Sequence, residues 1–589
     1  MREVSGVIAE WLDGLSHRLR MAVRHSRLIT SFSKSCDSGR MERWEDVRCF
    51  HHRMLAAVER SRLLGAWQDL FRIIREGSLS NVGLFLATAG GVTLGGRLLQ
   101  GQGSVAELWL PLGLLLVAAP LLSSQRAVGR AILSSLLLSS FFLGFCGFSR
   151  DSFAAPAKES LHRGGALFFG LAAGVLSVLL SPQTVLLGCF LLIAVSIAMA
   201  LPELALVLLL LCTPVIALTQ HPTTVLSVCL VALFLLLLPK LFTGKRQLSF
   251  SAADLAVGLS AVLWSVSGGM GVAQAILLLG GWFPARWLTS SAKWRGRCLA
   301  ALSLSATGVS ALGIWQYLAG EAQLKWVDLT RFGDIGGRVC GVFENPNVLA
   351  SYLLLTVPLT LIWAVSASSV WGGVLGALGF GAGSLCLLLT WSRGAWLGWI
   401  FSTVLFFMCY SRRSLSVCLA GLLPTAALAS WLPGTVLRRF ASIFGRGDSS
   451  IRYRVDTWRG VWRMLAAHPA GIGCGDEVFH RVYPLYAVSG TESVMHAHQI
   501  WLQLAVELGI VGAMLVACQV LMILRCGAWG CRCMPPGRGR GALLAMLASL
   551  VGALTMGVFD HIWYHKLPFW IFWCLCAMLW SLVEGREWE

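Results

Sequence analysis

Apolar residues dominate this chain in long runs that polar loops separate. Each run has about 17 to 25 residues, the length that an α-helix needs to cross the hydrocarbon core of a bilayer. The candidate spans are residues 107–124, 129–149, 165–181, 183–200, 203–219, 222–242, 252–269, 270–289, 297–318, 348–367, 370–391, 394–411, 414–432, 500–524, 541–559 and 567–584. The pattern predicts an all-α polytopic membrane protein with about 14–17 transmembrane helices and one long external loop that contains amphipathic helices.

Basic residues in the short loops predict how the spans are oriented. The clusters at 240–246, 286–297, 412–413 and 525–540 fall on one side when the spans alternate, and that side is expected to be the cytoplasm. Sixteen spans leave both termini on the cytoplasmic side. The glycine-rich run 82–101, which contains Arg97, is therefore expected not to cross. Arg126 and Arg130 are exceptions, since this scheme places them outside.

The alternation of polar and apolar stretches also divides the chain. Residues 1–80 carry fourteen Lys and Arg against ten Asp and Glu, with apolar positions at helical spacing. They predict a basic, amphipathic region at the inner membrane face. Residues 81–250 predict transmembrane helices without a motif. The remainder divides into a transmembrane core at 251–432 with an external loop at 319–347, a long external loop at 433–498, and C-terminal transmembrane helices at 499–589.

Composition and charge narrow the class of protein. Hydrophobic residues make up 56% of the chain and charged residues only 13%. The hydrophobic core of a soluble protein would not account for so many long apolar runs, so a soluble globular protein is excluded. The net charge of +18 lies in short loops, which suits anionic membrane lipids and argues against nucleic acid as a partner. The eighteen cysteines are scattered, many inside apolar runs, and predict buried thiols rather than a disulfide framework.

Four polar elements are expected together on the external side: the loop 319–347, the turn around Arg393, the long loop 433–498 and the turn 560–566. A loop as long as 433–498 is usually functional. It carries eight arginines and no lysine, and Val455, Trp458, Trp462 and Leu465 predict an amphipathic helix within it that lies at the membrane interface.

Two arginines outside that loop are candidates for chemistry. Arg338 precedes the turn Asn345-Pro346-Asn347, in which Asn347 is expected to cap the following helix. An ordinary capped loop explains the asparagines equally well, but it does not explain Arg338. Arg393 lies almost inside a helical pair, where a charge is costly unless it is paired or faces water, and this favours a function.

His496 and His498 stand where the next span begins. Residues two apart do not share a helix face, so a shared metal ion is disfavoured unless the segment is extended. A histidine that converges with arginines suits a general base or an anion ligand, although an interfacial histidine without chemistry remains an alternative. An arginine-rich pocket fits a diphosphate, because guanidinium groups bind phosphate oxygens bidentately. No Asp-x-Asp motif, P-loop or zinc signature is present, so neither metal nor cofactor is expected.

These motifs, in this order, resemble the O-antigen ligase and polymerase superfamily over roughly residues 250–585. They are Arg338 with Gly-x-Phe-x-Asn-Pro-Asn, Ser-Arg-Gly-Ala-Trp-Leu-Gly at 392–398, the segment 452–462 with His-Pro and a Gly-x-Gly turn, and His-Ala-His-Gln at 496–499. In the ligases, a histidine is followed by Asn, Ser or Gln and, after nine residues, by glycine. His498, Gln499 and Gly509 match that spacing.

The resemblance implies His498 as the base, with Arg338 and Arg393 as the other catalytic residues. It also implies that Arg452 or Arg454 contacts a lipid diphosphate. Asn345, Asn347 and His496 complete the predicted substrate-binding residues.

The expected function is a bacterial membrane glycosyltransferase. It would transfer or polymerise a glycan from a polyprenyl diphosphate carrier onto a hydroxyl at the external face of the cytoplasmic membrane. The acceptor would be a glycan, a lipid or a protein. Two alternatives remain open: a multi-pass transporter of an anion or a lipid-linked intermediate, and a non-catalytic assembly component. A transporter is expected to carry its charges near the bilayer midplane, often with internal repeats.

Overall fold

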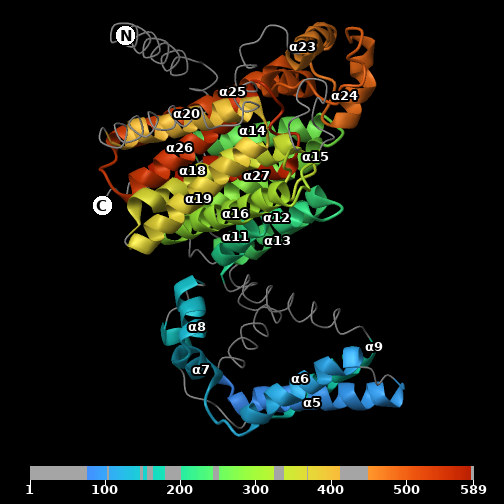
Figure 1. The fold of residues 1–589 in the computed structure, drawn as a ribbon, viewed down its shortest axis with the longest axis vertical. Helices are drawn as coiled ribbons and strands as arrows, with labels where there is room; N and C mark the ends of the chain where they lie inside the picture. The colour runs from blue at the N-terminus through green and yellow to red at the C-terminus, as the bar shows by residue number, and fades with distance from the viewer. Residues whose placement is uncertain are drawn as a thin grey trace, which may run out of the picture. The chain divides into compact units, whose positions relative to one another are not determined.

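The computed structural model describes residues 76–101, 105–145, 150–154, 163–179, 201–242, 251–323, 337–367, 369–411 and 449–584 (Figure 1). These residues form helices joined by turns and contain no strand. Most of the basic region expected at 1–80 (residues 1–75), the candidate spans 183–200 and 414–432, and parts of both external loops lie outside the described residues. Those predictions remain untested.

The first described helices form a small packed group. They are α5 (Leu79–Leu99), α6 (Val105–Leu122), α7 (Val128–Ser134), α8 (Leu136–Ser139), the π-helix η1 (Ser140–Phe145), the 3-10 helix η2 (Arg150–Phe153) and α9 (Arg163–Leu179). Helix α5 packs against α6 and α9, and Gly170 and Gly174 let α9 approach it closely. Small residues at such contacts are typical of helix packing in membranes. Arg97 is buried in this group and donates from Nη2 to the carbonyl of Ser177 at 3.1 Å.

Helix α5 differs from the expectation for residues 82–101. It has 21 residues and enough apolar character to cross a membrane. The amide of Leu79 donates to the carbonyl of Arg126 at 2.8 Å, so Arg126 lies beside the N-terminal end of α5. The length and composition of α5 thus speak against the expectation that residues 82–101 do not cross.

The larger group of helices carries the core. It contains α11 (Pro202–Leu211), α12 (Thr213–Ala217), α13 (Pro222–Phe242), α14 (Ala252–Val266), α15 (Gly271–Leu288), α16 (Ala292–Leu318), α18 (Pro346–Ser366), α19 (Val370–Leu389), α20 (Arg393–Tyr410), α25 (Ile500–Cys533), α26 (Arg538–Gly557) and α27 (Lys566–Glu584) (Figure 1). Helix α18 packs against α16, α19, α20, α26 and α27, and 83% of its most apolar 18-residue stretch is buried. It therefore lies inside the bundle.

The structure confirms an all-α polytopic membrane protein. Within the described residues, α5, α16, α18, α19, α25, α26 and α27 are long and apolar enough to span, and five shorter apolar helices accompany them. The run 203–219 is split into α11 and α12 next to Pro214, which cannot donate a backbone hydrogen bond. The run 129–149 is split into α7, α8 and η1. The expected total of about 14–17 spans stays a prediction, since two runs are not described.

The loop between α20 and α25 contains α23 (Ser449–Ala467), α24 (Asp476–Val482) and the 3-10 helix η5 (Tyr483–Leu485). Helix α23 is amphipathic, as predicted, but the buried face differs. Val461, Met464 and Leu465 are buried against α24, η5 and the start of α25, whereas Trp462 is 59% exposed. Val461 and Met464 were not part of the predicted stripe, and the predicted place of Trp462 at the membrane interface stays a prediction.

A buried cluster of its own attaches this loop to the bundle. It joins apolar side chains of α23 to Phe479, Tyr483 and residues 505–506 of α25. Each fully buried side chain of this size stabilises the fold by about 1.5–3 kcal/mol. The cluster also contains Ala497, so the same packing places its two neighbours, His496 and His498.

Candidate active site at the end of the helices

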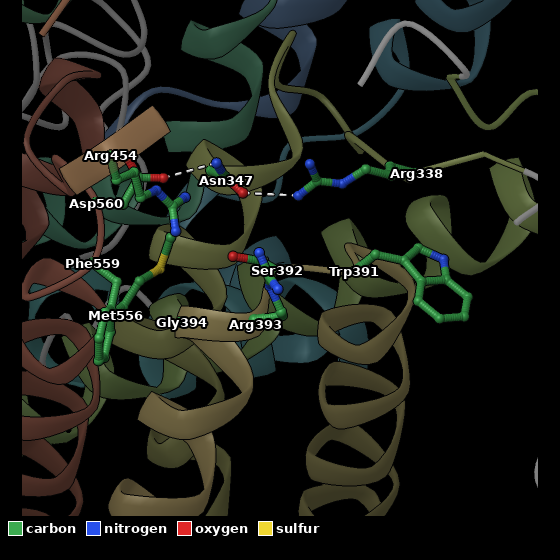
Figure 2. A pocket seen from close by; sticks show the side chains of 10 residues that line it. All are labelled: Arg338, Asn347, Trp391, Ser392, Arg393, Gly394, Arg454, Met556, Phe559 and Asp560. Atoms are coloured by element: carbon green, nitrogen blue, oxygen red, sulfur yellow. Dashed lines mark hydrogen bonds between the residues drawn. The ribbon is translucent and has the colours of Figure 1, made fainter. Parts of the chain in front are cut away.

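Four polar segments meet at one end of the larger helix group, where α18, α20, α25 and α27 begin and α19 and α26 end. They line a small pocket of about 70 Å³ (Figure 2). Its lining residues are Arg338, Asn347, Trp391, Ser392, Arg393, Gly394, Arg454, Met556, Phe559 and Asp560. The predicted convergence of the loop 319–347, the turn at Arg393, the loop 433–498 and the turn 560–566 is thus seen in the structure.

Arg338 is fixed by two contacts from different elements. Its Nε donates to the carbonyl of Thr390 at 2.7 Å, and its Nη2 donates to Oδ1 of Asn347 at 2.8 Å (Figure 2). The first contact joins the segment before α18 to the end of α19. These two acceptors, a carbonyl and a side-chain amide oxygen, orient the guanidinium group.

Arg393 is the first residue of α20 and is 9% exposed. The turn before it is tight: Trp391 has φ 54°, a backbone conformation that non-glycine residues seldom adopt, and its side chain is buried. The N-terminus of a helix carries a partial positive charge. Arg393 adds a full charge at the same place, so this end of α20 favours an anion.

The asparagines have different tasks from those expected. Asn345, not Asn347, caps α18: its side chain accepts from the amide of Asn347 at 2.8 Å. The predicted cap was wrong by two residues because Pro346 occupies the first helical position, which leaves Asn345 outside the helix. Asn347 is free to bridge instead. Its Oδ1 accepts from Arg338 and its Nδ2 donates to Oδ2 of Asp560 at 2.8 Å (Figure 2).

Asp560 joins this bridge to the histidine. Its Oδ1 lies 3.2 Å from Nδ1 of His498 and also accepts from the amide of His561 at 2.8 Å. Burial alone would raise the pKa of Asp560, but the hydrogen bond and charge of His498 and the charge of Arg454 hold it below its usual range. Asp560 is therefore an anion, and hydrogen bonds connect Arg338, Asn347, Asp560 and His498 in series.

His496 lies next to His498, with ring centroids 4.2 Å apart. The contact arises because His498 has φ 47°, so the chain turns back on itself and the amide of His498 donates to Nδ1 of His496 at 3.2 Å. Such a left-handed residue costs of the order of 1–3 kcal/mol, which surrounding contacts must offset. Burial, with the charge of His498, lowers the pKa of His496 to about 3, so His496 is neutral at physiological pH.

The same turn creates a possible set of metal ligands that the sequence argument disfavoured. Donor atoms of His496, His498 and Asp560 all lie within 4.8 Å of one another, and such donors suit zinc-like ions. The charge of Arg454 acts on both His496 and Asp560, however, and repels a cation. The electrostatics of the pocket thus favour an anion over a metal ion.

The arginines of α23 separate into two groups. Arg454 lines the pocket, whereas Arg452 is exposed and does not line it. Arg459 and Arg463 are exposed as well, and Arg459 pairs with Asp456 at 2.8 Å. Of the predicted pair, Arg454 is therefore the residue placed to contact a pocket ligand. Arg459 and Arg463 form a solvated face, which was one of the two interpretations that the pattern allowed.

The sequence pattern grouped Asp560 with the other segments of the site but gave it no role. Its only signal was the polar turn between the last two apolar runs. Ser392, which also lines the pocket, is the first residue of the motif at 392–398, but the sequence assigned it no role.

Fold and site together define a multi-pass helical membrane protein with an arginine-lined pocket beside a carboxylate-held histidine. Residues 378–517 match the family model described as O-antigen ligase. The match confirms the resemblance to the O-antigen ligase superfamily, over a narrower range than the expected 250–585. It contains Arg393, Arg454 and both histidines; Arg338, Asn347 and Asp560 lie outside it. No curated protein matches the chain.

Proposed function

We propose that this protein transfers a glycan from a polyprenyl diphosphate carrier to an acceptor hydroxyl at the external face of the cytoplasmic membrane. The family match supports a membrane glycan transferase of the O-antigen ligase or polymerase type. The observation that carries the finer proposal is the series of hydrogen bonds from Arg338 through Asn347 and Asp560 to His498. It joins a cationic pocket to a histidine that is oriented for proton transfer.

The arginines stabilise the leaving group. Arg338, Arg393 and Arg454 come from three separate segments and line one pocket. When the bond between the anomeric carbon and the diphosphate oxygen breaks, its electron pair leaves with the diphosphate, and negative charge increases there. Fixed guanidinium groups stabilise that charge more in the transition state than in the ground state. Asp560, the carboxylate among the described lining residues, is engaged by Asn347 and His498.

His498 is the general base of the proposed reaction. Anionic Asp560 favours the tautomer in which Nδ1 carries the proton and donates to it, and this leaves Nε2 to accept the proton of the acceptor hydroxyl. The hydroxyl oxygen then forms the new bond to the anomeric carbon. The arrangement follows the logic of a base oriented by a carboxylate, known from catalytic triads.

The test is transfer by the purified protein in detergent, with a labelled polyprenyl diphosphate glycan and a mixed pool of acceptors. Arg393→Ala and His498→Ala are each expected to lower the rate by about 100-fold or more. Arg459→Ala is the matched control, since that arginine is exposed on α23, and it is expected to keep the wild-type rate. Undiminished transfer by Arg393→Ala or His498→Ala would contradict the role of that residue.

Two further assays separate the remaining alternatives. A polymerase produces a ladder of glycan lengths in complemented deletion strains, whereas loss of a ligase leaves completed chains on the carrier. Uptake of the labelled donor into proteoliposomes without release of polyprenyl diphosphate would favour a transporter instead.

A further inference from the structure

Ala497, the residue between the two histidines, is held on both of its backbone groups by side chains. Its amide donates to Oε1 of Gln503 at 2.8 Å, and its carbonyl accepts from Nε1 of Trp458 at 3.0 Å. Ala497 is fully buried, so neither group can turn to water instead. Ala497 is thus the fixed point of the turn that carries the histidines.

Gln503 reaches Ala497 from the first turn of α25. Side chains of a helix point back toward its N-terminus, which brings the amide of Gln503 under the preceding loop. Its Nε2 donates to Oε1 of Glu507 at 2.9 Å, one helical turn further on. Because the NH₂ group of Gln503 donates to the side chain of Glu507, the amide oxygen of Gln503 is the atom that faces Ala497. Glu507 therefore sets which atom of Gln503 meets the turn.

Glu507 is itself held in a buried polar cluster. It is 3% exposed and Gln503 is fully buried. The carboxylate accepts from the amide of Gly475 and interacts with the charge of Lys566 at the start of α27. Glu507 is therefore held by groups outside the pocket, and neither Gln503 nor Glu507 lines it.

We infer that Gln503 and Glu507 are positioning residues that hold the turn of His496, Ala497 and His498 in its active shape. The inference rests on the proposed function, since it presupposes His498 as the base. His498 is left-handed at φ 47° and relaxes when nothing fixes its neighbour. Without Gln503, the amide of Ala497 is buried and unsatisfied, which drives the turn to rearrange. Nε2 of His498 then leaves the acceptor hydroxyl.

The first test compares Gln503→Leu with Gln519→Leu. Gln519 is a buried glutamine of the same helix, further from the site, and accepts from Ser260 at 2.9 Å. Gln503→Leu is expected to lower kcat by about 10- to 100-fold, because small misplacements of a catalytic group have effects of that size. Its KM for the donor stays within about threefold, since the arginines lie on other elements. Gln519→Leu keeps kcat.

A second pair of variants keeps the inference testable if Gln503→Leu does not fold. Gln503→Glu places two carboxylates together and is expected to lower kcat. Adding Glu507→Gln reverses the pair: the new carboxylate accepts from Ala497 and from the new amide. The double variant is expected to regain at least about tenfold in kcat over the single one, as coupled neighbours do.

The outcomes separate this inference from the proposed function. Wild-type kcat in Gln503→Leu, an equal loss in Gln519→Leu, or no recovery in the double variant overturns the positioning role. If His498→Ala keeps the wild-type rate, the proposed role of His498 as the base fails and the inference fails with it. If His498→Ala is inactive while Gln503→Leu is fully active, only the inference fails.

Discussion

Oδ1 of Asp560 lies 3.2 Å from Nδ1 of His498, although 62 residues separate the two in sequence. The contact joins the loop before α25 to the turn between α26 and α27. Asp560 is also bonded through its second oxygen to Asn347, so its orientation is determined from both sides. A carboxylate held in this way determines which nitrogen of the imidazole carries the proton.

The first prediction follows from that contact. Asp560→Asn preserves the shape of the side chain but allows its amide to donate to Nδ1, which places the proton of the imidazole on Nε2 and removes the base. We expect kcat for glycan transfer to fall by about 100- to 10,000-fold, the range of general base catalysis. Asp456→Asn on α23 is the control and should keep kcat. Full activity of Asp560→Asn would show that His498 acts without a carboxylate partner.

The second prediction concerns metal ions. In the proposed mechanism, the arginines of the pocket supply the positive charge that a metal would otherwise give. The charge of Arg454 also acts against a cation at His496 and Asp560. Treatment with EDTA followed by desalting is expected to leave the initial rate of transfer unchanged. Loss of activity that added Mg²⁺, Mn²⁺ or Zn²⁺ restores would contradict the arginine mechanism.

Alternation of the helices was enough to predict that Arg338, Arg393, His498 and Asp560 share one end of the protein. That inference needs only the lengths of the apolar runs, and the structure confirms the convergence. The local geometry was not predictable in the same way. Choosing Asn345 over Asn347 as the cap depends on where Pro346 sits relative to the helix start, and element boundaries are the least certain part of a sequence pattern.

The contact between His496 and His498 was missed for a different reason. Periodicity arguments assume helix or strand, and neither brings residues two apart together. The left-handed backbone of His498 does, and it depends on Gln503 and Trp458, which act through Ala497. Contacts of this kind produce no periodic pattern of polar and apolar residues in the sequence. The buried face of α23 was missed similarly, because α24 and η5 pack on Val461 and Met464, which the predicted stripe did not contain.

The third prediction is a pH dependence of stability at His496. Its pKa is about 3 in the folded protein against an ordinary value of 6.5, because burial and the charge of His498 oppose protonation. Between these values the unfolded chain binds a proton that the folded protein does not, so stability falls as the pH is lowered from 6.5 toward 3.

The depressed pKa of Asp560 adds a loss in the same direction only below its ordinary value of 3.8. His496→Gln should therefore remove part of the loss between pH 6.5 and 4.5, where the slope for one group reaches at most about 1.4 kcal/mol per pH unit. Thermal unfolding in detergent across that range measures it. Identical pH profiles for wild type and His496→Gln would show that the folded protein does not hold the pKa of His496 below its ordinary value.

The last prediction concerns Gly509, the glycine of the spacing that follows His498. Its φ of 76° interrupts the helical backbone of α25. Backbone groups beside this break form hydrogen bonds with the segment 469–472. The amide of Ile472 donates to the carbonyl of Val506 at 2.7 Å, and the amide of Ile510 donates to the carbonyl of Pro469 at 3.1 Å. A Cβ at this position would lie 2.7 Å from the backbone of Ala470. No side chain at position 509 fits without moving that segment.

Gly509→Ala is therefore expected to destabilise the protein by at least about 1–3 kcal/mol from backbone strain, before the clash is counted. It should also lower transfer, because the displaced segment 469–473 adjoins the cluster that holds Ala497. Gly308→Ala is the matched control: it lies within α16 with open space at its Cβ, and alanine is the better helix former there by about 0.5–1 kcal/mol. Unfolding temperatures of the two variants should move in opposite directions. A Gly509→Ala protein as stable as wild type would show that the break in α25 is not required.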